Sequence, residues 1–196
     1  MEARHYRKLD ADRVRCLLCP HHCLIPPGGR GRCRVRSNRE GILEADSYGR
    51  PVTVALDPIE KKPLFHFHPG ATILSTGPNG CNLSCRFCQN WQISQTDLPT
   101  RELSPGDLVA MARRHGSIGI AYTYTEPLVW FEYLLDACAL ARDQGLANVL
   151  VTNGTIDPGP LAELLPLVDA MNIDLKSMDA AFYREVCGGD RDTVLG

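Results

Sequence analysis

The sequence of 196 residues lacks any long apolar run. Its first residues, Met1 to His5, do not open a signal peptide, and no later apolar stretch is long enough to span a bilayer. We therefore expect a cytoplasmic protein without membrane partners. A strong net charge is also missing, because the formal charge of −2 gives no general signal for nucleic-acid binding. Only the region around Cys33 is locally basic, through Arg30, Arg32, Arg34, Arg36 and Arg39.

What the sequence does contain is an ordinary globular composition with many cysteines. Hydrophobic residues make up 44% and charged residues 22%, which is the composition of a globular protein able to bury a core. The length predicts one domain plus an appendage. The nine cysteines are an odd number and are unevenly clustered, in a chain with no export signal. They are therefore better interpreted as metal ligands and core residues than as disulfides.

The chain divides near Pro69-Gly70 into two parts of different character. Residues 1–70 are rich in cysteines and in turn-forming residues. Within them, residues 41–48 and 52–56 flank a short Gly-Arg-Pro segment, which predicts a hairpin with a short turn. Residues 71–196 instead alternate strand-like and helix-like segments.

Four strand-helix units are predicted in this second part. The strands are short apolar runs at 71–75, 118–123, 148–152 and 171–175. The helix signals are Ser104 before Pro105 with Gly116 at the end, a periodic segment from about Leu128 to Gln144 with Gly145 as its cap, Asp157 before Pro158, and Asp179 capping a last helix. Repeated units of this kind form a parallel sheet with right-handed crossovers, and ligands bind at the carboxyl ends of its strands. The pattern therefore predicts an α/β fold.

The number of units limits how complete this fold can be. A closed eightfold barrel takes about 250 residues. We therefore expect a partial (β/α) barrel with a small Cys-rich subdomain in front of it. The chain is expected to be truncated, with an open sheet edge and further units beyond Gly196.

Three cysteines follow the first predicted strand of the second part. Cys81, Cys85 and Cys88 are separated by three and by two residues. Three thiolates suit a four-iron cluster with one iron left open for a small molecule, whereas a closed zinc or ferredoxin site needs a fourth local ligand. The alternative is a zinc knuckle that borrows its fourth ligand from His66, His68 or a cysteine nearer the N-terminus.

The cysteine spacing, the strand before it and the aromatic residue Phe87 together resemble the radical S-adenosylmethionine (radical SAM) superfamily. The resemblance implies a 4Fe-4S cluster on the three cysteines and S-adenosylmethionine as the cosubstrate. Phe87 is then either a ring that packs beside the adenine or an anchor of the loop.

Polar residues at the ends of the later strands resemble cosubstrate-binding segments of that superfamily. Thr125-Glu126 stands where a Gly-Gly-Glu type segment usually meets the amino group of the methionine moiety, with Tyr124 and Thr125 in place of the glycines. Thr152-Asn153 and the pair Asp174 and Lys176 resemble segments of glycyl-radical activating enzymes, such as pyruvate formate-lyase activating enzyme, that lie around the carboxylate and ribose. The alternatives are an exposed acid at Glu126 and a surface ion pair of Asp174 with Lys176.

The resemblance to one family of the superfamily covers nearly the whole chain. The similar segments are Cys16 to Cys23, Gly28 to Cys33, Asp57 to His66, Cys81 to Gln95 and Tyr122 to Pro127. They are similar to the radical enzyme of the AmmeMemoRadiSam system. This implies the radical SAM fold and cofactor without indicating a substrate.

The N-terminal part carries four cysteines of its own. Cys16, Cys19, Cys23 and Cys33 are separated by two, three and nine residues. Four thiolates can close a metal site, which favours structural zinc or an auxiliary iron-sulfur cluster over four unligated core cysteines.

Together these patterns predict a radical SAM oxidoreductase. The reduced cluster passes one electron to S-adenosylmethionine, and the resulting 5′-deoxyadenosyl radical abstracts hydrogen from a substrate. Since the cluster drives the cleavage, no catalytic acid or base is assigned. An electron donor such as flavodoxin or ferredoxin is implied, and by analogy with the activases the substrate is another protein. The alternatives are radical modification of a small molecule or RNA, and a metal-binding interaction module without catalysis. Whether this chain is active alone stays open.

Overall fold

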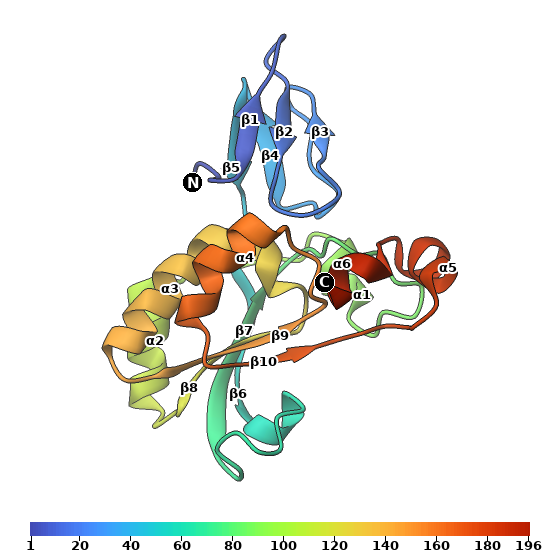
Figure 1. Ribbon diagram of the computed structural model, residues 1–196. Coiled ribbons are helices and arrows are strands. Elements are labelled where there is room, and N and C mark those ends of the chain that lie inside the picture. The colour runs from blue at the N-terminus through green and yellow to red at the C-terminus, as the bar shows by residue number, and fades with distance from the viewer.

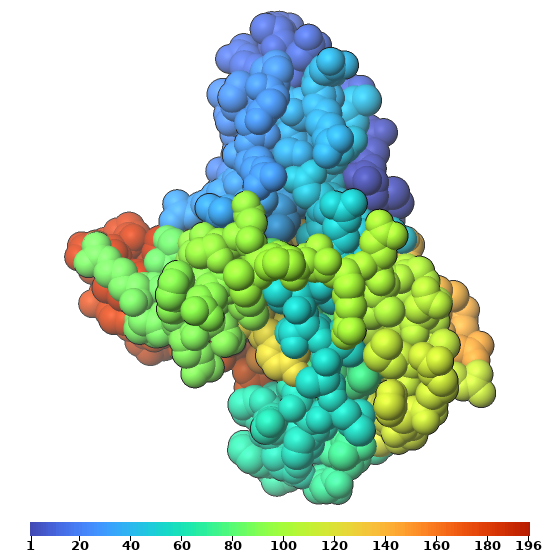
Figure 2. All heavy atoms as spheres, turned by 180° about the vertical axis from the view of Figure 1, so that it is seen from behind, coloured from blue at the N-terminus to red at the C-terminus, as the bar shows by residue number.

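A computed structural model describes all residues, 1–196. The N-terminal residues form a separate lobe of small antiparallel strands, drawn in blue above the rest of the chain in Figure 1. Seen from behind, the same lobe stands on top of the larger part (Figure 2). Its strands are β1 (Tyr6–Lys8), β2 (Val14–Cys16), β3 (Leu24–Ile25), β4 (Arg36–Arg39) and β5 (Ile42–Ala45). The first three form one sheet, and β4 pairs with β5 in a second.

The larger part is built on a five-stranded sheet. Its strands are β6 (Pro51–Pro58), β7 (Thr72–Pro78), β8 (Gly119–Tyr122), β9 (Ala147–Thr152) and β10 (Ala170–Ile173). They lie in the order β10-β9-β8-β7-β6. The four strands predicted from the sequence, β7 to β10, are parallel to one another, as expected, whereas β6 runs antiparallel to β7.

The predicted hairpin between residues 41–48 and 52–56 is wrong. Strand β5 pairs with β4, and β6 instead joins the main sheet, with Asp57 opposite Ile73. An alternating apolar pattern shows that a segment is a strand but does not identify its partner. The main sheet thus takes its edge strand from before the expected boundary at Pro69-Gly70.

Helices cover one face of the main sheet (Figure 1). They are α2 (Pro105–Arg114), α3 (Phe131–Asp143) with the short 3-10 turn η2 (Pro127–Trp130) before it, and α4 (Pro158–Leu164) with η3 (Leu165–Leu167) after it. The Ser104 hydroxyl caps α2 by accepting a hydrogen bond from the amide of Asp107, as the sequence predicts. Leu74, Ile120, Tyr122 and Leu150 point from the strands into the core under these helices. No helix combines the length and the apolar character that crossing a membrane requires.

The opposite face of the sheet has a different cover. Ile73, Ala121 and Val149 alternate with the helix-facing residues and pack against Ile59 in a small cluster. Ile59 begins the 3-10 turn η1 (Ile59–Lys61), which follows β6 directly. The space between η1 and the carboxyl ends of the strands therefore lies on the helix-free face.

The C-terminal segment packs beside the cysteine loop. Here α5 (Ala180–Phe182) continues into a π-helical turn, η4 (Tyr183–Cys187), and α6 (Arg191–Leu195) follows. Asp179 caps α5 as predicted, since its carboxylate accepts from the amide of Ala181. The helix expected after Asp179 is thus present, and Gly188, with φ +70°, ends it after Cys187, so that α6 follows as a separate short helix.

One buried ion pair links the two parts. Arg36 on β4 donates to the carboxylate of Glu132 on α3 at 2.6 Å, and the two side chains are only 1% and 2% exposed.

The small α1 (Trp91–Gln95) lies just after the cysteine loop.

Candidate cofactor site

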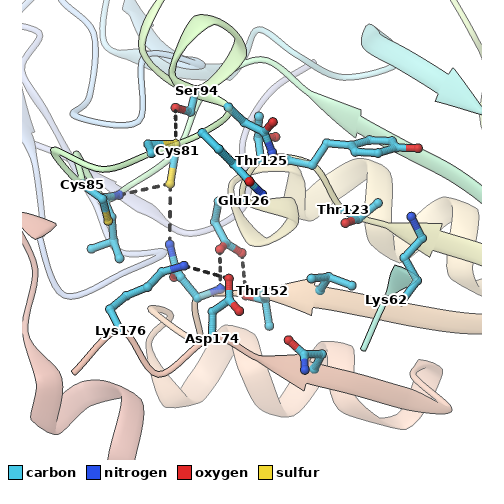
Figure 3. Close-up of a pocket in the computed structure, with 18 of the residues that line it drawn as sticks. Lys62, Cys81, Cys85, Ser94, Thr123, Thr125, Glu126, Thr152, Asp174 and Lys176 are labelled. Carbon is cyan, nitrogen blue, oxygen red and sulfur yellow. Dashed lines mark hydrogen bonds and ion pairs between the residues drawn. The ribbon is translucent and has the colours of Figure 1, made fainter. Parts of the chain in front are cut away.

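A cavity of about 550 Å³ opens at the carboxyl ends of β7 to β10. Its lining includes all three cysteines of the loop after β7. It also includes every residue that the sequence predicts to bind S-adenosylmethionine. These are Cys81, Cys85, Phe87, Cys88, Thr125, Glu126, Thr152, Asn153, Asp174 and Lys176. Figure 3 shows side chains from the cysteine loop and from the strand ends converging on this space. The strand-end geometry expected of a parallel sheet brings them together.

The three cysteines of the loop are partly exposed to this cavity. The amide of Leu83 donates to Cys81 Sγ at 3.4 Å, and Asn153 Nδ2 lies 3.6 Å from the same sulfur. Cys88 Sγ lies 3.4 Å from the hydroxyl of Ser94. Burial raises the pKa of the Cys85 thiol to about 12 and that of Cys81 further, the latter also because of the nearby Glu126 charge. In this setting a metal is needed to stabilise the thiolates.

The arrangement fits a cluster better than a single ion. A multi-iron cluster binds each cysteine at a different iron, so its ligands need not meet at one point. His66 and His68, the alternative zinc ligands, do not line the cavity. The donor set of three cysteines around a large open space therefore fits a 4Fe-4S cluster with one free iron.

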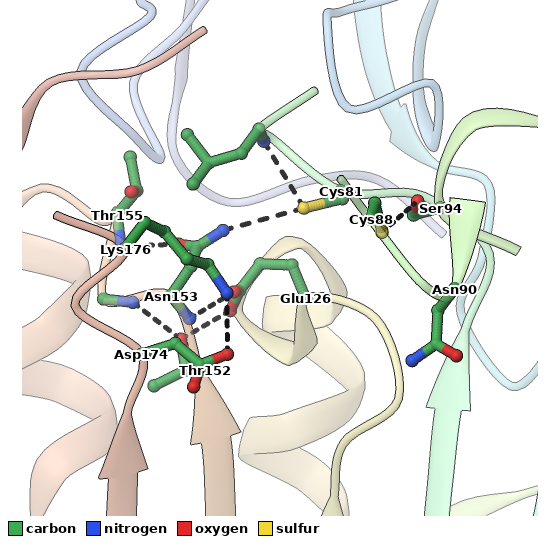
Figure 4. A network of polar contacts seen from close by, with 12 residues as sticks. Cys81, Cys88, Asn90, Ser94, Glu126, Thr152, Asn153, Thr155, Asp174 and Lys176 are labelled. Atoms are coloured by element: carbon green, nitrogen blue, oxygen red, sulfur yellow. Dashed lines mark hydrogen bonds and ion pairs between the residues drawn. The ribbon is translucent and has the colours of Figure 1, made fainter. Parts of the chain in front are cut away.

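Glu126 lies at the centre of a polar network between β8 and β9 (Figure 4). Its Oε1 accepts from the Thr152 hydroxyl at 2.6 Å and from the Leu128 amide at 2.9 Å, while Oε2 accepts from the Asn153 amide at 2.8 Å. The residue is 1% exposed, and this burial raises its pKa to about 7 despite the three hydrogen bonds. The carboxylate is buried and bonded, which rules out the alternative of an exposed acid.

Asn82 connects this network to the cysteine loop, a role that the sequence did not indicate. Its Oδ1 accepts from Asn153 Nδ2 at 2.9 Å, and its own Nδ2 donates to the carbonyl of Thr155 at 2.7 Å. The residue between Cys81 and Leu83 thereby fixes the loop against the turn after β9. The only signal in the sequence was an asparagine directly after the first cysteine. Its hydrogen-bond partners lie about seventy residues away, so its role could not be predicted.

Asp174 and Lys176 form an ion pair at the edge of the cavity. Lys176 Nζ lies 2.7 Å from Asp174 Oδ2, and the two side chains are 22% and 50% exposed. Burial lowers the pKa of Lys176, but Asp174 and the nearby Cys85 outweigh this and raise it. Phe87 is more exposed, and its ring lies 5.8 Å from that of Phe182. The ion pair and the Phe87 ring line the cavity together with Cys85.

The C-terminal turn supports the cysteine loop from outside. The amides of Ser84 and Arg86 donate to the carbonyls of Cys187 and Val186 at 2.8 and 3.0 Å. The following glycine approaches closely, because a Cβ on Gly188 would lie 2.5 Å from Ser84 Oγ. This backbone pairing accounts for the two glycines after Cys187, which carry no recognisable motif.

The four N-terminal cysteines line a second, much smaller cavity of about 10 Å³. Burial raises the pKa of Cys19 to about 12 and that of Cys33 to about 11. Arg36 lines the same cavity, and its Nε and Nη1 are buried without a hydrogen-bond partner. Unpaired cationic donors beside four thiols fit an anionic tetrathiolate, although the sulfurs would have to draw closer around an ion.

Comparison with known proteins identifies the family. The model of the radical SAM superfamily matches residues 76–195, which include the cysteine loop and the three parallel strands after it. The chain belongs to the radical SAM superfamily. Members of this superfamily use a 4Fe-4S cluster and S-adenosylmethionine for radical chemistry.

Relatives of this radical SAM protein differ in how much of the chain they match. Uncharacterized protein MJ0808 of Methanocaldococcus jannaschii is 49% identical over 99% of the chain, which spans 58% of that protein's length. Pyruvate formate-lyase-activating enzyme of Clostridium pasteurianum is 26% identical over 56% of the chain and 48% of the relative. A solved structure of TYW1 with a lysine-pyruvate adduct bound gives a TM-score of 0.47 at 20% identity, covering 72% of the chain and 59% of the TYW1 chain. The chain thus spans about half the length of the curated relatives it matches.

At position 124 this chain has a tyrosine where the superfamily usually has a glycine. This residue has φ +70°, a left-handed conformation that costs a non-glycine residue on the order of 1 kcal/mol. Its carbonyl accepts from Asn90 Nδ2 at 2.7 Å, and its hydroxyl donates to Asp57 Oδ2 at 2.6 Å. The backbone thus keeps a glycine-like conformation while a phenol extends down the cavity.

Proposed function

We propose that this chain binds a 4Fe-4S cluster through Cys81, Cys85 and Cys88 and uses it to cleave S-adenosylmethionine reductively. The observation that carries the proposal is one cavity that joins these cysteines to polar residues from three successive strand ends. When bound, the cluster supplies one electron to the sulfonium, which yields methionine and a 5′-deoxyadenosyl radical for hydrogen abstraction.

The residues around the cluster have separate roles in this proposal. Lys176 and Asn153 lie where they can donate to the carboxylate of the methionine moiety, and Asp174 lies where it can accept from an amino or ribose hydroxyl group. Thr152 and Glu126 hold the turn that carries Asn153. Glu126 thereby acts as a positioning residue, because three of its acceptor positions are already occupied within the protein.

Thr125 and Phe87 complete the proposed cosubstrate pocket. The hydroxyl of Thr125 donates to the carbonyl of Pro78 at 2.8 Å and so fixes the segment after β8 against the end of β7. Phe87 offers an apolar face beside Phe182 at the mouth, where an adenine ring can stack.

The substrate in this proposal is another protein, on which a glycyl or similar radical is formed. Similarity to a pyruvate formate-lyase-activating enzyme supports this choice. Radical modification of a small molecule or RNA is the second candidate, since the cavity continues beyond the strand ends toward Asp57 and Lys62. A binding module without catalysis has no use for polar side chains at three strand ends. The electron donor is a flavodoxin or ferredoxin, and the location is the cytoplasm.

We also propose that residues 1–70 hold a structural metal, while residues 71–196 provide the four parallel units. Cys16, Cys19, Cys23 and Cys33, which line one small cavity, are its ligands. The metal is zinc, because four thiolates close a tetrahedral site, and an auxiliary iron-sulfur cluster is the alternative. The unpaired donors of Arg36 would face the tetrathiolate.

The experiment is anaerobic reconstitution followed by iron and sulfide analysis and electron paramagnetic resonance of the reduced protein. We expect about four irons bound by the triad per chain and a change of the spectrum when S-adenosylmethionine is added, because the open iron gains ligands. Asn153→Ala should retain the iron but lose most of the spectral change. A cluster whose spectrum stays the same when S-adenosylmethionine is added would contradict the proposal.

A further inference from the structure

The cavity has a second polar end, away from the cysteines. Figure 3 shows Lys62 across the cavity from Cys81 and Cys85. Asp57, Lys61, Lys62 and Tyr124 line this end, which lies near the amino end of β7, because Asp57 pairs with Ile73. A cosubstrate held at the strand ends would leave this deeper end free.

The four side chains form one connected group. Asp57 Oδ2 accepts from Lys62 Nζ at 2.7 Å and from the Tyr124 hydroxyl at 2.6 Å, and Asp57 Oδ1 lies 3.2 Å from Lys61 Nζ. Lys62 Nζ also lies 4.8 Å from the centre of the Tyr124 ring, within range of a cation–π contact. The four side chains are therefore held together by direct contacts within the protein.

Charge distinguishes this end from the other. Two ammonium groups face the single carboxylate of Asp57, so the group carries a formal charge of +1. At the cysteine end, Lys176 is paired with Asp174 and Glu126 adds a second carboxyl group, so no positive charge is in excess there.

Burial makes the excess positive charge significant. The Lys62 side chain is 3% exposed, and its ammonium has three donor hydrogens, of which Asp57 takes one. A buried cation with unused donors favours an acceptor group that brings negative charge. The strained backbone of Tyr124 is consistent with a site built for a ligand.

We propose that this end of the cavity binds an anionic oxygen group of the substrate, a carboxylate or a phosphate, between Lys62 and Lys61. The inference rests on the proposed function, which places S-adenosylmethionine at the strand ends beside the cysteines. It narrows the substrate to a molecule or peptide side chain that carries such an anion within reach of the radical.

The test is equilibrium dialysis of the whole chain against radiolabelled inorganic phosphate and, separately, radiolabelled acetate. We expect one of the two probes to bind saturably with a dissociation constant of about 1 mM or tighter. Lys62→Met should weaken this binding by at least about tenfold, since a charged hydrogen bond is lost. Lys8→Met, on the exposed strand β1, is the matched control and should change nothing.

A second variant separates binding from folding. Asp57→Asn removes the carboxylate that competes for both lysines, so it should strengthen binding of the probe. The proposal is wrong if neither probe saturates, if Lys62→Met binds like the wild type, or if Asp57→Asn leaves binding equal or weaker. Should Lys62→Met fail to fold, Asp57→Asn decides alone. Dialysis needs neither cluster nor turnover, so its failure is distinct from a failure to cleave S-adenosylmethionine.

Discussion

The carboxylate of Glu126 accepts a hydrogen bond from the backbone amide of Asn153 at 2.8 Å, which ties the end of β8 to the turn after β9. The other carboxylate oxygen is taken by the Thr152 hydroxyl and the Leu128 amide. The shape of the turn therefore depends on a side chain that belongs to the neighbouring strand. The same turn places Asn153 beside Cys81.

Glu126→Gln is expected to disturb this turn while keeping the size of the side chain. An amide has one acceptor oxygen, so it cannot accept from Asn153 on one side and from Leu128 and Thr152 on the other. We expect a loss of about 1–3 kcal/mol in the free energy of unfolding and weaker binding of S-adenosylmethionine. Urea unfolding and equilibrium binding measure the two effects. Glu102→Gln, at an exposed position, is the control; equal behaviour of the two variants would contradict the role given to Glu126.

Glu132→Ala is expected to be strongly destabilising. It leaves Arg36 buried without its counter-ion, for which the cost is about 3–5 kcal/mol. Glu44→Ala breaks a pair of similar length, 2.8 Å, whose arginine is 70% exposed, and should cost at most about 1 kcal/mol. Thermal and urea unfolding of both variants provide the comparison. Similar losses for the two would mean that the buried pair does not hold the lobes together.

Gly80 and Gly70 offer a test of why a glycine precedes the first cysteine. Both have positive φ, +93° and +78°, but a Cβ on Gly80 would overlap the Cys33 carbonyl, whereas one on Gly70 has free space. Gly70→Ala should cost about 1–2 kcal/mol from backbone strain alone. Gly80→Ala should cost more and also lower the iron bound after reconstitution, because the Cys33 carbonyl and the Val35 side chain lie against this point, directly before Cys81. Equal stability and equal iron content in both would refute the explanation.

Removal of the N-terminal cysteines tests the second metal. The double variant Cys16→Ser/Cys19→Ser should lose about one zinc per chain, measured by elemental analysis of protein purified without added metal. Cys138→Ala, at a buried position on α3, should keep it. Loss of iron in place of zinc would indicate an auxiliary cluster, and an unchanged metal content would mean that these cysteines are merely packed.

Local signals in the sequence were sufficient for much of the fold and for one end of the cavity. The Ser104 cap, the glycines after α2 and α3 and the apolar runs predicted the parallel units, because each signal acts within a few residues. The strand ends of a parallel sheet meet at one edge, so Glu126, Asn153 and Lys176 could be placed near the cysteines without knowing any distance.

The rest of the fold and the other end of the cavity depend on contacts between segments that are distant in sequence. Strand β6 has an ordinary alternating pattern, and only the three-dimensional pairing shows that it places Asp57 beside the end of η1. Lys62 and Tyr124 meet there from segments about sixty residues apart, so neither could be recognised as part of the site. The backbone pairing that supports the cysteine loop, from Cys187, likewise leaves no side-chain pattern.

The most direct test of the central claim is formation of 5′-deoxyadenosine by the reconstituted chain with S-adenosylmethionine and a chemical reductant under anaerobic conditions. The wild type and Cys138→Ala should form it, while Cys81→Ala, Cys85→Ala and Cys88→Ala should each lose it together with the cluster iron. Product that persists in any of these three variants would contradict the cluster assignment on which the account rests.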